Sequence, residues 1–404
     1  MPDPIRRESP AQSASLAAEG WLNRNVIGMG LTSFLSDLGH EMATALLPLF
    51  LLNIGASASA LGAIEGVADA LSSFVKLAAG WYTDRIGQRK PLVILGYTLT
   101  ASTGLFALAT AWPQVLLIRA LGWLGRGIRG PLRDAILAES VPAEARGRAF
   151  GFHRAGDTVG AIGGPLVALA LVGMGANYRS VFWLSALPGL LAALAFTTLV
   201  REQRRQPNHT LRLWQSIGAL PLRFKLFLVG VGVFGLGDFA HSLLTLRAAQ
   251  VLTPTLGAAQ ASTLAVSLYV LHNVFYAGAS FPVGALADRL GKRGLLALGY
   301  LLAVAMNLAL IAAVPNLAIL GLIFALGGMV IATEDALEGA IAADLLPEEL
   351  RGTGYGVLAT VNGLGDFLSS LVVGSLWAGL APAAGFGYAA ALGLAGAIIL
   401  FRVR

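Results

Sequence analysis

Two Asp-x-x-His sequences stand out among the ionisable residues of this chain. One is Asp37–His40 and the other is Asp238–His241, an offset of 201 residues. If both segments are helical, the i, i+3 spacing places the carboxylate and the imidazole on one face of each helix. Such pairs suit proton transfer, because histidine titrates near neutral pH. They equally suit divalent metals that bind nitrogen and oxygen ligands. Both chemistries stay open at this point.

Other ionisable residues also interrupt apolar stretches. Glu65 and Asp69 are spaced i, i+4. Ionisable groups at bilayer depth are costly unless they are paired or face water, so each is a functional candidate. We take Glu65 as the best single proton carrier, together with the two Asp/His pairs. The residues expected to line a polar substrate cavity are Glu41, Asp69, Arg119, His272 and Asn273.

Opposite charges occupy equivalent places in the two halves of the chain. A shift of 205 residues puts Arg129 on Glu334 and Arg133 on Glu338. We expect these residues to pair as a gate between the halves when one side of the molecule is closed. Solvated helix ends would carry the same charges, and exposed ion pairs contribute little.

The elements that position these groups must be membrane spans. Hydrophobic residues make up 56% of the 404 residues and charged residues only 12%, whereas soluble domains carry about 25% charged residues. Glycine is abundant, at 50 residues, and lets membrane helices approach closely. We therefore predict an all-α membrane protein in contact with the lipid bilayer.

Twelve apolar segments are long enough to cross a bilayer, which takes about 20 residues. The first six are residues 25–52, 58–82, 91–111, 113–138, 147–173 and 179–200. The second six are residues 224–251, 259–287, 294–314, 316–344, 352–380 and 382–401. The expected organisation is a tail (1–24), a six-helix bundle (25–200), a linker (201–223) and a second six-helix bundle (224–401).

Lysine and arginine set the orientation of these spans. They gather in alternate loops and near both ends of the chain, at Arg6, Arg7, Arg402 and Arg404. Cytoplasmic loops carry this excess, so we expect both termini, and the tail and linker, to lie in the cytoplasm below the inner membrane of the cell. The net charge of +6 belongs to these loops and indicates no nucleic-acid partner.

Several chemistries find no support in the sequence. The chain has no cysteine, so it has no thiolate metal site or thiol chemistry. It also lacks a Walker-type phosphate loop and a zincin motif. We therefore expect a protein that is not an enzyme and needs no cofactor. We also expect the protein to be monomeric.

One stretch occurs in both halves. Gly80-Trp-Tyr-Thr-Asp-Arg-Ile-Gly-Gln-Arg-Lys90 corresponds to Gly284-Ala-Leu-Ala-Asp-Arg-Leu-Gly-Lys-Arg293, at an offset of 204. Both copies join two apolar segments, so the chain is expected to consist of two repeats with pseudo-symmetry. The residues singled out as a cytoplasmic latch are Gly80, Asp84, Arg85, Gly87, Arg89, Lys90, Asp288, Arg289, Gly291 and Arg293.

The 80–90 stretch resembles the signature of the major facilitator superfamily between its second and third helices. Gln88 stands where a basic residue is more usual. The resemblance implies a secondary active transporter that moves a small molecule by alternating access. It also implies that the latch holds the two halves together on the cytoplasmic side, whereas retained positive charge alone would explain the same residues.

The fifth segment adds a hint about direction. Gly156, Gly160 and Gly164 are spaced four residues apart, and Pro165 follows directly. This run resembles a motif of the superfamily's proton-coupled exporters, although the final Gly-Gly is missing. The resemblance implies proton-coupled export, by antiport, of a small organic compound. The alternative is a divalent metal exporter that uses Asp37, His40, Asp238 and His241. Substrate and direction stay open.

Overall fold

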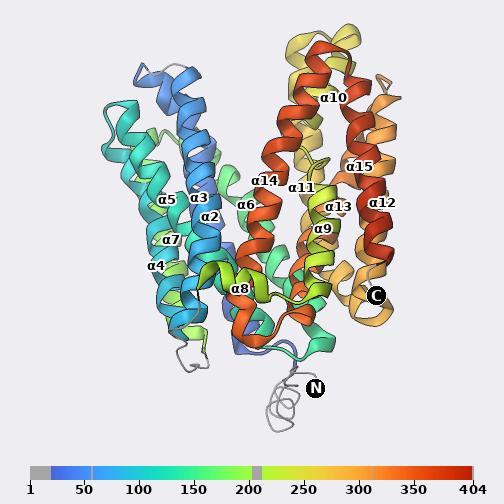
Figure 1. Cartoon of the computed structure of the whole chain (residues 1–404). Helices are drawn as coiled ribbons and strands as arrows, with labels where there is room; N and C mark the ends of the chain where they lie inside the picture. Colours follow the sequence, from blue (N-terminus) through green and yellow to red (C-terminus); the bar gives the residue numbers. More distant parts are fainter. Residues whose placement is uncertain (1–19, 56–57, 203–211, 313, 403–404) are drawn as a thin grey trace, which may run out of the picture.

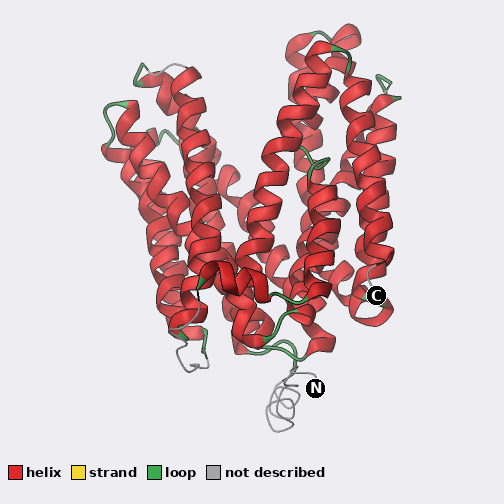
Figure 2. Ribbon diagram, in the orientation of Figure 1, coloured by secondary structure: helices red, strands yellow, loops and turns green. Residues whose placement is uncertain are grey.

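The described part of the chain is helical and contains no strand, as predicted (Figure 2). The computed structural model describes residues 20–55, 58–202, 212–312 and 314–402. The first half contains α2 (Arg24–Asn53), α3 (Ala58–Ile86), α4 (Lys90–Thr100) with the 3₁₀ helix η1 (Ala101–Leu108), α5 (Trp112–Glu139), η2 (Ala143–Ala145), α6 (Arg146–Gly173) and α7 (Tyr178–Leu199). The second half contains α8 (Leu213–Ala219), α9 (Leu222–Gly235), α10 (His241–Leu256), α11 (Ala258–Leu290), α12 (Lys292–Ile311), α13 (Leu317–Leu345), η3 (Glu348–Leu350), α14 (Arg351–Gly379) and α15 (Pro382–Arg402).

These helices make twelve spans in two six-helix bundles within the described residues. α4 and η1 together form one span, and so do α9 and α10. Eight of these described spans, with α4 and η1 counted as one, are long and apolar enough by composition to cross a membrane. α5 falls below that standard because it carries Arg119, Arg126, Arg129, Arg133 and Asp134.

The outer faces of the bundles are apolar. Leu117 on α5 is 64% exposed and Leu322 on α13 is 62% exposed. Many other large apolar side chains are exposed as well. A surface of this kind would be costly in water and is matched to lipid. The chain is therefore an all-α, multi-pass membrane protein, as its composition predicted.

The two bundles meet at one end of the molecule. Figure 1 shows α3 beside α14, and the contacts between helices also place α6 against α11. The ribbons of the two bundles converge at the end where the short helix α8 lies across them and diverge toward the other end (Figure 1). α8 is bent by 96° from α9. We call the end where the bundles meet the closed end.

The expected spans match the helices, with one exception. Eleven of them end within four residues of the observed helix ends. The seventh, expected as a continuous helix over 224–251, is broken: α9 ends at Gly235 and α10 starts at His241. Glycine is a poor helix former, and Gly237 packs so tightly that an added Cβ would lie 2.9 Å from the carbonyl oxygen of Ala389.

Two serines of α14 bond to the chain at this break. The Ser369 hydroxyl donates to the carbonyl oxygen of Asp238, and the Ala240 N–H donates to the Ser370 hydroxyl oxygen at 2.9 Å. Side chains of a neighbouring helix therefore satisfy backbone groups that a continuous helix would have paired internally.

Candidate functional site between the bundles

Asp84, at the end of α3, caps the first turn of α14 in the other bundle. Its carboxylate accepts backbone N–H groups of Gly352 at 3.0 Å and Thr353 at 2.6 Å. The Arg89 guanidinium also donates to it, at 3.0 Å. A carboxylate at a helix N-terminus satisfies free N–H groups and interacts favourably with the helix dipole. Asp84 thus joins the two bundles directly.

Asp288 makes the equivalent contact in the opposite direction. It lies at the end of α11 and accepts the backbone N–H groups of Gly147 at 2.9 Å and Arg148 at 3.0 Å, at the start of α6. The Arg148 side chain adds a bond of 3.1 Å. Each bundle therefore supplies one acid that caps a helix of its partner bundle.

Glycines allow these caps to form. Gly80 lies against Gly352 and Gly284 lies against Gly147, so close that a Cβ on any of the four would overlap the facing glycine's carbonyl oxygen. Only glycine permits backbones to cross at this separation.

The other predicted latch residues shape each motif within its own bundle. Gly87 and Gly291 have backbone φ angles of 70° and 101°, which residues with a side chain rarely adopt. The Lys90 ammonium donates to the carbonyls of Thr197 and Val200 at the end of α7. The Arg85 guanidinium lies 5.6 Å from the Trp81 ring. Arg289 is exposed, and Arg293 borders a surface pocket beside Asp288.

Two ion-pair groups with the same plan surround the caps. Glu139 of α5 pairs with Arg89 at 2.9 Å and with Arg351 of the other bundle at 3.7 Å. Asp344 of α13 pairs with Lys292 at 2.7 Å and with Arg146 of the other bundle at 2.7 Å. Sequence reasoning missed both acids, although they are separated by the same offset of 205 that relates α5 to α13.

The predicted gate between Arg129/Arg133 and Glu334/Glu338 is wrong for this conformation. Arg129 pairs with Asp37 at 3.5 Å and Arg133 pairs with Asp134 at 3.0 Å. On the other side, Glu338 accepts the Tyr300 hydroxyl at 2.7 Å and the Asn362 amide at 2.6 Å. These charged side chains find closer partners within their own bundle, on α5 itself for Arg133 and on neighbouring helices for Arg129 and Glu338.

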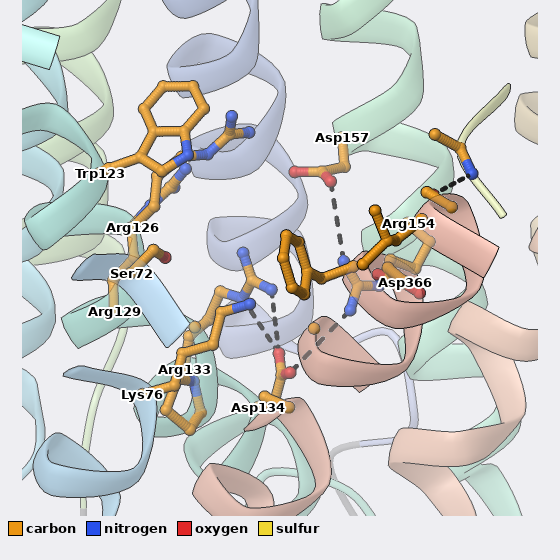
Figure 3. Close-up of a pocket in the computed structure, with 18 residues that line it drawn as sticks. Ser72, Lys76, Trp123, Arg126, Arg129, Arg133, Asp134, Arg154, Asp157 and Asp366 are labelled. Carbon is orange, nitrogen blue, oxygen red and sulfur yellow. Dashed lines mark hydrogen bonds and ion pairs between the residues drawn. The ribbon is translucent and has the colours of Figure 1, made fainter. Parts of the chain in front are cut away.

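A cavity of about 780 Å³ lies between α3, α5 and α6 of the first bundle and α14 of the second (Figure 3). Its cationic lining residues are Lys76, Arg126, Arg129, Arg133 and Arg154, and its acidic ones are Asp134, Asp157 and Asp366. Trp123 and Phe367 add apolar surface. The cavity is the best candidate for a substrate site in the described structure.

Arg154 of α6 links the two bundles beside this cavity. Its guanidinium lies 3.8 Å from Asp157, 4.0 Å from Asp134 and 3.8 Å from Asp335 of α13. Figure 3 shows it between Asp157 and Asp134. The Tyr276 hydroxyl also donates to Asp335. Arg154 is therefore the arginine that makes a pair of the kind predicted for Arg129 and Arg133.

Asp37 and His40 do not act on each other. Asp37 pairs with Arg126 at 3.0 Å as well as with Arg129. His40 Nε2 lies 3.3 Å from the Thr44 hydroxyl, its Nδ1 has no partner, and its ring lies 4.8 Å from that of Trp123. The expected carboxylate–imidazole pair is thus replaced by a carboxylate–arginine group.

Asp238 and His241 do not share a helix face, contrary to the prediction, because the helix is broken between them. The His241 ring instead lies 4.6 Å from that of His272. Asp238 lies within hydrogen-bonding reach of Glu334. Asp238, Glu334, Glu338 and Asp366 interact electrostatically as one acidic group of the second bundle. Asp366 also interacts with Lys76 across the cavity.

The remaining predicted cavity residues are dispersed. Arg119 is buried, donates to Thr44 at 2.9 Å and lies over the Trp123 ring at 3.7 Å. Glu41 packs beside Gly164, and Asn273 bonds with Tyr269. The side chains of Glu65 and Asp69 lie outside the described structure. None of the described ones lines the cavity, whereas Trp123 and Ser72, which no motif marked, do.

The glycines of α6 form a contact face, as expected from their spacing. A Cβ on Gly156 would lie 2.8 Å from the Gly30 carbonyl oxygen, and one on Gly164 would lie 2.7 Å from that of Leu38. Gly160 packs equally tightly on Phe34. The partner helix is therefore α2. Pro165 follows inside α6.

The described residues contain no group of three or more histidine, cysteine, aspartate or glutamate side chains that could hold a metal ion. Although His241 and His272 are adjacent, they form only a pair. The divalent-metal alternative therefore gains no site in the described part of the chain.

Sequence comparison identifies relatives over most of the chain. A family model described as Major Facilitator Superfamily matches residues 29–247 and 238–404. An uncharacterized MFS-type transporter of Methanocaldococcus jannaschii is 32% identical over 94% of this chain and 95% of its own length. A probable 4-methylmuconolactone transporter of Cupriavidus pinatubonensis is 26% identical over 64% of this chain and 61% of its own. The quinolone resistance protein NorA of Staphylococcus aureus is 21% identical over 54% and 57%.

Structure comparison shows the same fold. The fucose:proton symporter FucP of E. coli matches with a TM-score of 0.74 at 15% sequence identity. The match covers 94% of this chain and 98% of the symporter chain.

Proposed function

Because the chain belongs to the major facilitator superfamily, we propose that it is a proton-coupled exporter of a small organic compound, working by alternating access. Protons entering the cell would drive the compound out. The protein would lie in the inner membrane with both termini in the cytoplasm, and it would transport its substrate without altering it chemically.

The reciprocal caps carry this proposal. Asp84 and Asp288 each bond to backbone N–H groups that belong to the other bundle. Both contacts lie at the closed end, so that end can open only if both caps break. The basic motifs lie at the same end, which supports a cytoplasmic location for it. The described conformation would then be the one closed to the cytoplasm.

The acidic group of the second bundle supports proton coupling. Glu338 accepts two neutral donors, Tyr300 and Asn362, and one carboxylate oxygen of Glu334 is buried without a hydrogen-bond partner. Buried charges need compensation, and a proton can supply it where no cation does. We assign proton coupling to Asp238, Glu334 and Glu338, while Glu65 stays a prediction from the sequence.

Two observations favour export. The glycine face of α6 packs on α2, and this run of glycines resembles a motif of the superfamily's proton-coupled exporters. One relative is a quinolone resistance protein, and this role fits the removal of an organic compound from the cell.

Distance measurements on labelled protein test the mechanism. The chain has no cysteine, so Glu144→Cys with Leu290→Cys introduces the only two thiols, one at the closed end of each bundle. We expect the distance distribution between spin labels on this closed-end label pair to have a short and a long component. The ratio of the two should change between about pH 5 and about pH 8, the range in which proton switches operate.

The variants Asp238→Asn and Glu334→Gln should remove this pH dependence, while Glu349→Gln, an exposed acid at the closed end, should keep it. A single distance at every pH would contradict alternating access. Two distances in a pH-independent ratio would contradict proton coupling. For direction, liposomes containing the protein and the pH dye pyranine should show proton movement opposite to norfloxacin movement.

A further inference from the structure

We propose that Arg126 and Arg129 bind the anionic group of the transported compound, which is therefore an organic anion: a carboxylate or phosphate on an apolar body. This inference rests on the proposed transport function and names the substrate class of the same cavity.

Arg129 carries an unused hydrogen-bonding edge. The residue is only 3% exposed and lines the cavity. Nη2 lies 3.5 Å from Asp37 and the guanidinium covers the Tyr97 ring at 4.3 Å, but Nη1 has no partner. A buried donor without an acceptor is costly, and a charged one more so. An oxyanion entering the cavity would supply the acceptor.

Among the described residues, Arg126 and Arg129 share their nearest counter-charge. Arg126 and Arg129 both approach the same carboxylate oxygen of Asp37, at 3.0 Å and 3.5 Å. Asp37 therefore serves two guanidinium groups at ion-pair distance, while Asp157 acts on both of them from farther away. Arg126 remains 28% exposed in its side chain and faces the cavity beside Trp123 (Figure 3). Arginine pairs well with carboxylate and phosphate because its planar donors match two oxygens.

Acids lie near each of the other cationic lining residues, although Nε of Arg154 also lacks a hydrogen-bond partner. Arg133 bonds to Asp134, and Arg154 lies among Asp134, Asp157 and Asp335. Lys76 interacts with Asp366. A bound anion would therefore interact most favourably with Arg126 and Arg129.

The rest of the cavity suits an apolar body attached to that anion. Trp123 lies beside Arg126, with its ring 5.4 Å from the guanidinium carbon. On the opposite wall, Phe367 and Leu371 of α14 are 65% and 57% exposed, and both line the cavity. A ligand with its anion on α5 and its apolar part on α14 would touch both bundles.

Binding of matched probes to the full-length protein in detergent tests this assignment. The anionic probes are 1-naphthoate and 1-naphthyl phosphate, the neutral probe is 1-naphthamide, and the cationic probe is 1-naphthylmethylammonium. We expect the two anions to bind and to raise the melting temperature, and the neutral and cationic probes to bind at least tenfold more weakly, since a charge-assisted hydrogen bond is worth about that much.

Variants locate the site. Arg129→Gln and, separately, Arg126→Gln should weaken naphthoate binding about tenfold or more, and Arg129→Lys should restore part of it. Arg223→Gln, an exposed arginine at the start of α9, is the matched control and should bind as the unmodified protein does. Arg126 is partly exposed, so its variant keeps the test valid if Arg129→Gln fails to fold.

Three results would overturn the inference: equal binding of all the probes, no binding of the anions, or full anion binding by the Arg126→Gln protein. The assay uses no membrane or pH gradient. Pyranine-reported transport of norfloxacin with no anion binding would reject only the anion site, and anion binding with pH-independent label distances would reject only proton coupling.

Discussion

Tyr97 and Tyr300 each end a Leu-Gly-Tyr sequence in the third span of their bundle, but they meet opposite charges. The Tyr97 ring lies under the Arg129 guanidinium at 4.3 Å, and the Tyr97 hydroxyl has no hydrogen-bond partner. The Tyr300 hydroxyl donates to Glu338 at 2.7 Å. One side chain type thus supports a cation with its face in the first bundle and an acid with its hydroxyl in the second. The two repeats therefore retain a tyrosine in the third span, but the residue contacts a cation in one bundle and an acid in the other.

Removing the two hydroxyls should therefore have unequal effects. Tyr300→Phe takes a donor away from the buried Glu338 and should cost about 1–3 kcal/mol of unfolding free energy. Tyr97→Phe removes an unpaired hydroxyl, keeps the ring under Arg129 and should be nearly neutral. Thermal unfolding of the two variants in detergent gives the comparison. Equal losses would show that Glu338 does not depend on the hydrogen bond.

Neutralising a cap should favour opening of the closed end. Asp84→Asn keeps an acceptor oxygen but loses the charge at the start of α14 and the pairing with Arg89, a loss of about 1–2 kcal/mol. The closed-end label pair should then show a larger long-distance component. Asp288→Asn should act in the same direction, and the double variant should exceed either. An unchanged distribution in the double variant would remove the caps from the mechanism.

A methyl group at the helix crossing should prevent closure altogether. Gly80→Ala places a Cβ on the Gly352 carbonyl oxygen, and backbone atoms cannot yield as a side chain can. Gly278→Ala in α11 is the control, because nothing lies within 4 Å of its added Cβ. The closed-end label pair should report the long distance for the first variant and normal behaviour for the second. A short label distance in the Gly80→Ala protein would show that the closed end still closes when the added methyl group pushes α3 away from α14.

Asp37→Asn should separate the stability of the arginine wall from its affinity for anions. Without this carboxylate, two guanidinium groups lose their counter-charge, and breaking a buried pair costs about 3–5 kcal/mol. We expect a lower melting temperature without ligand and a larger rise on adding 1-naphthoate than in the unmodified protein. Melting curves with and without the probe provide the measurement. A smaller rise would mean that Asp37 helps bind the ligand.

The sequence predicted the fold well, for a physical reason. Membrane spans need long apolar segments, and loop charge follows topology, so helix number and most helix ends can be read locally. The exception was the break after Gly235. The apolar sequence on both sides of this break predicts one continuous helix. The serines that bond to backbone groups at the break, Ser369 and Ser370, are more than 120 residues away in the chain.

Site residues were harder to predict because their partners are distant. The repeat in the sequence identified Asp84 and Asp288. They bind backbone N–H groups at helix N-termini, and no sequence motif indicates which helix end such an acid will contact. Arg129 and Glu334 were paired by pseudo-symmetry, yet both meet nearer partners in their own bundle. Glu139 and Asp344, which do pair across the bundles, stand alone in the sequence. Ionisable residues within the apolar segments indicated which helices carry functional groups. They did not indicate which residues pair with one another in the folded protein.

Helix α14 touches two places that the proposed mechanism must coordinate. Near its start, Gly352 and Thr353 bond to Asp84, and Ser369 and Ser370 bond to the break that holds Asp238. These contacts are roughly 24 Å apart along an unbroken helix, at 1.5 Å per residue. A stiff helix cannot shift at one contact and stay fixed at the other. Release of one carboxylate would therefore disturb the surroundings of a second, and a compound wedged against Phe367, between the two, would arrest both events at once.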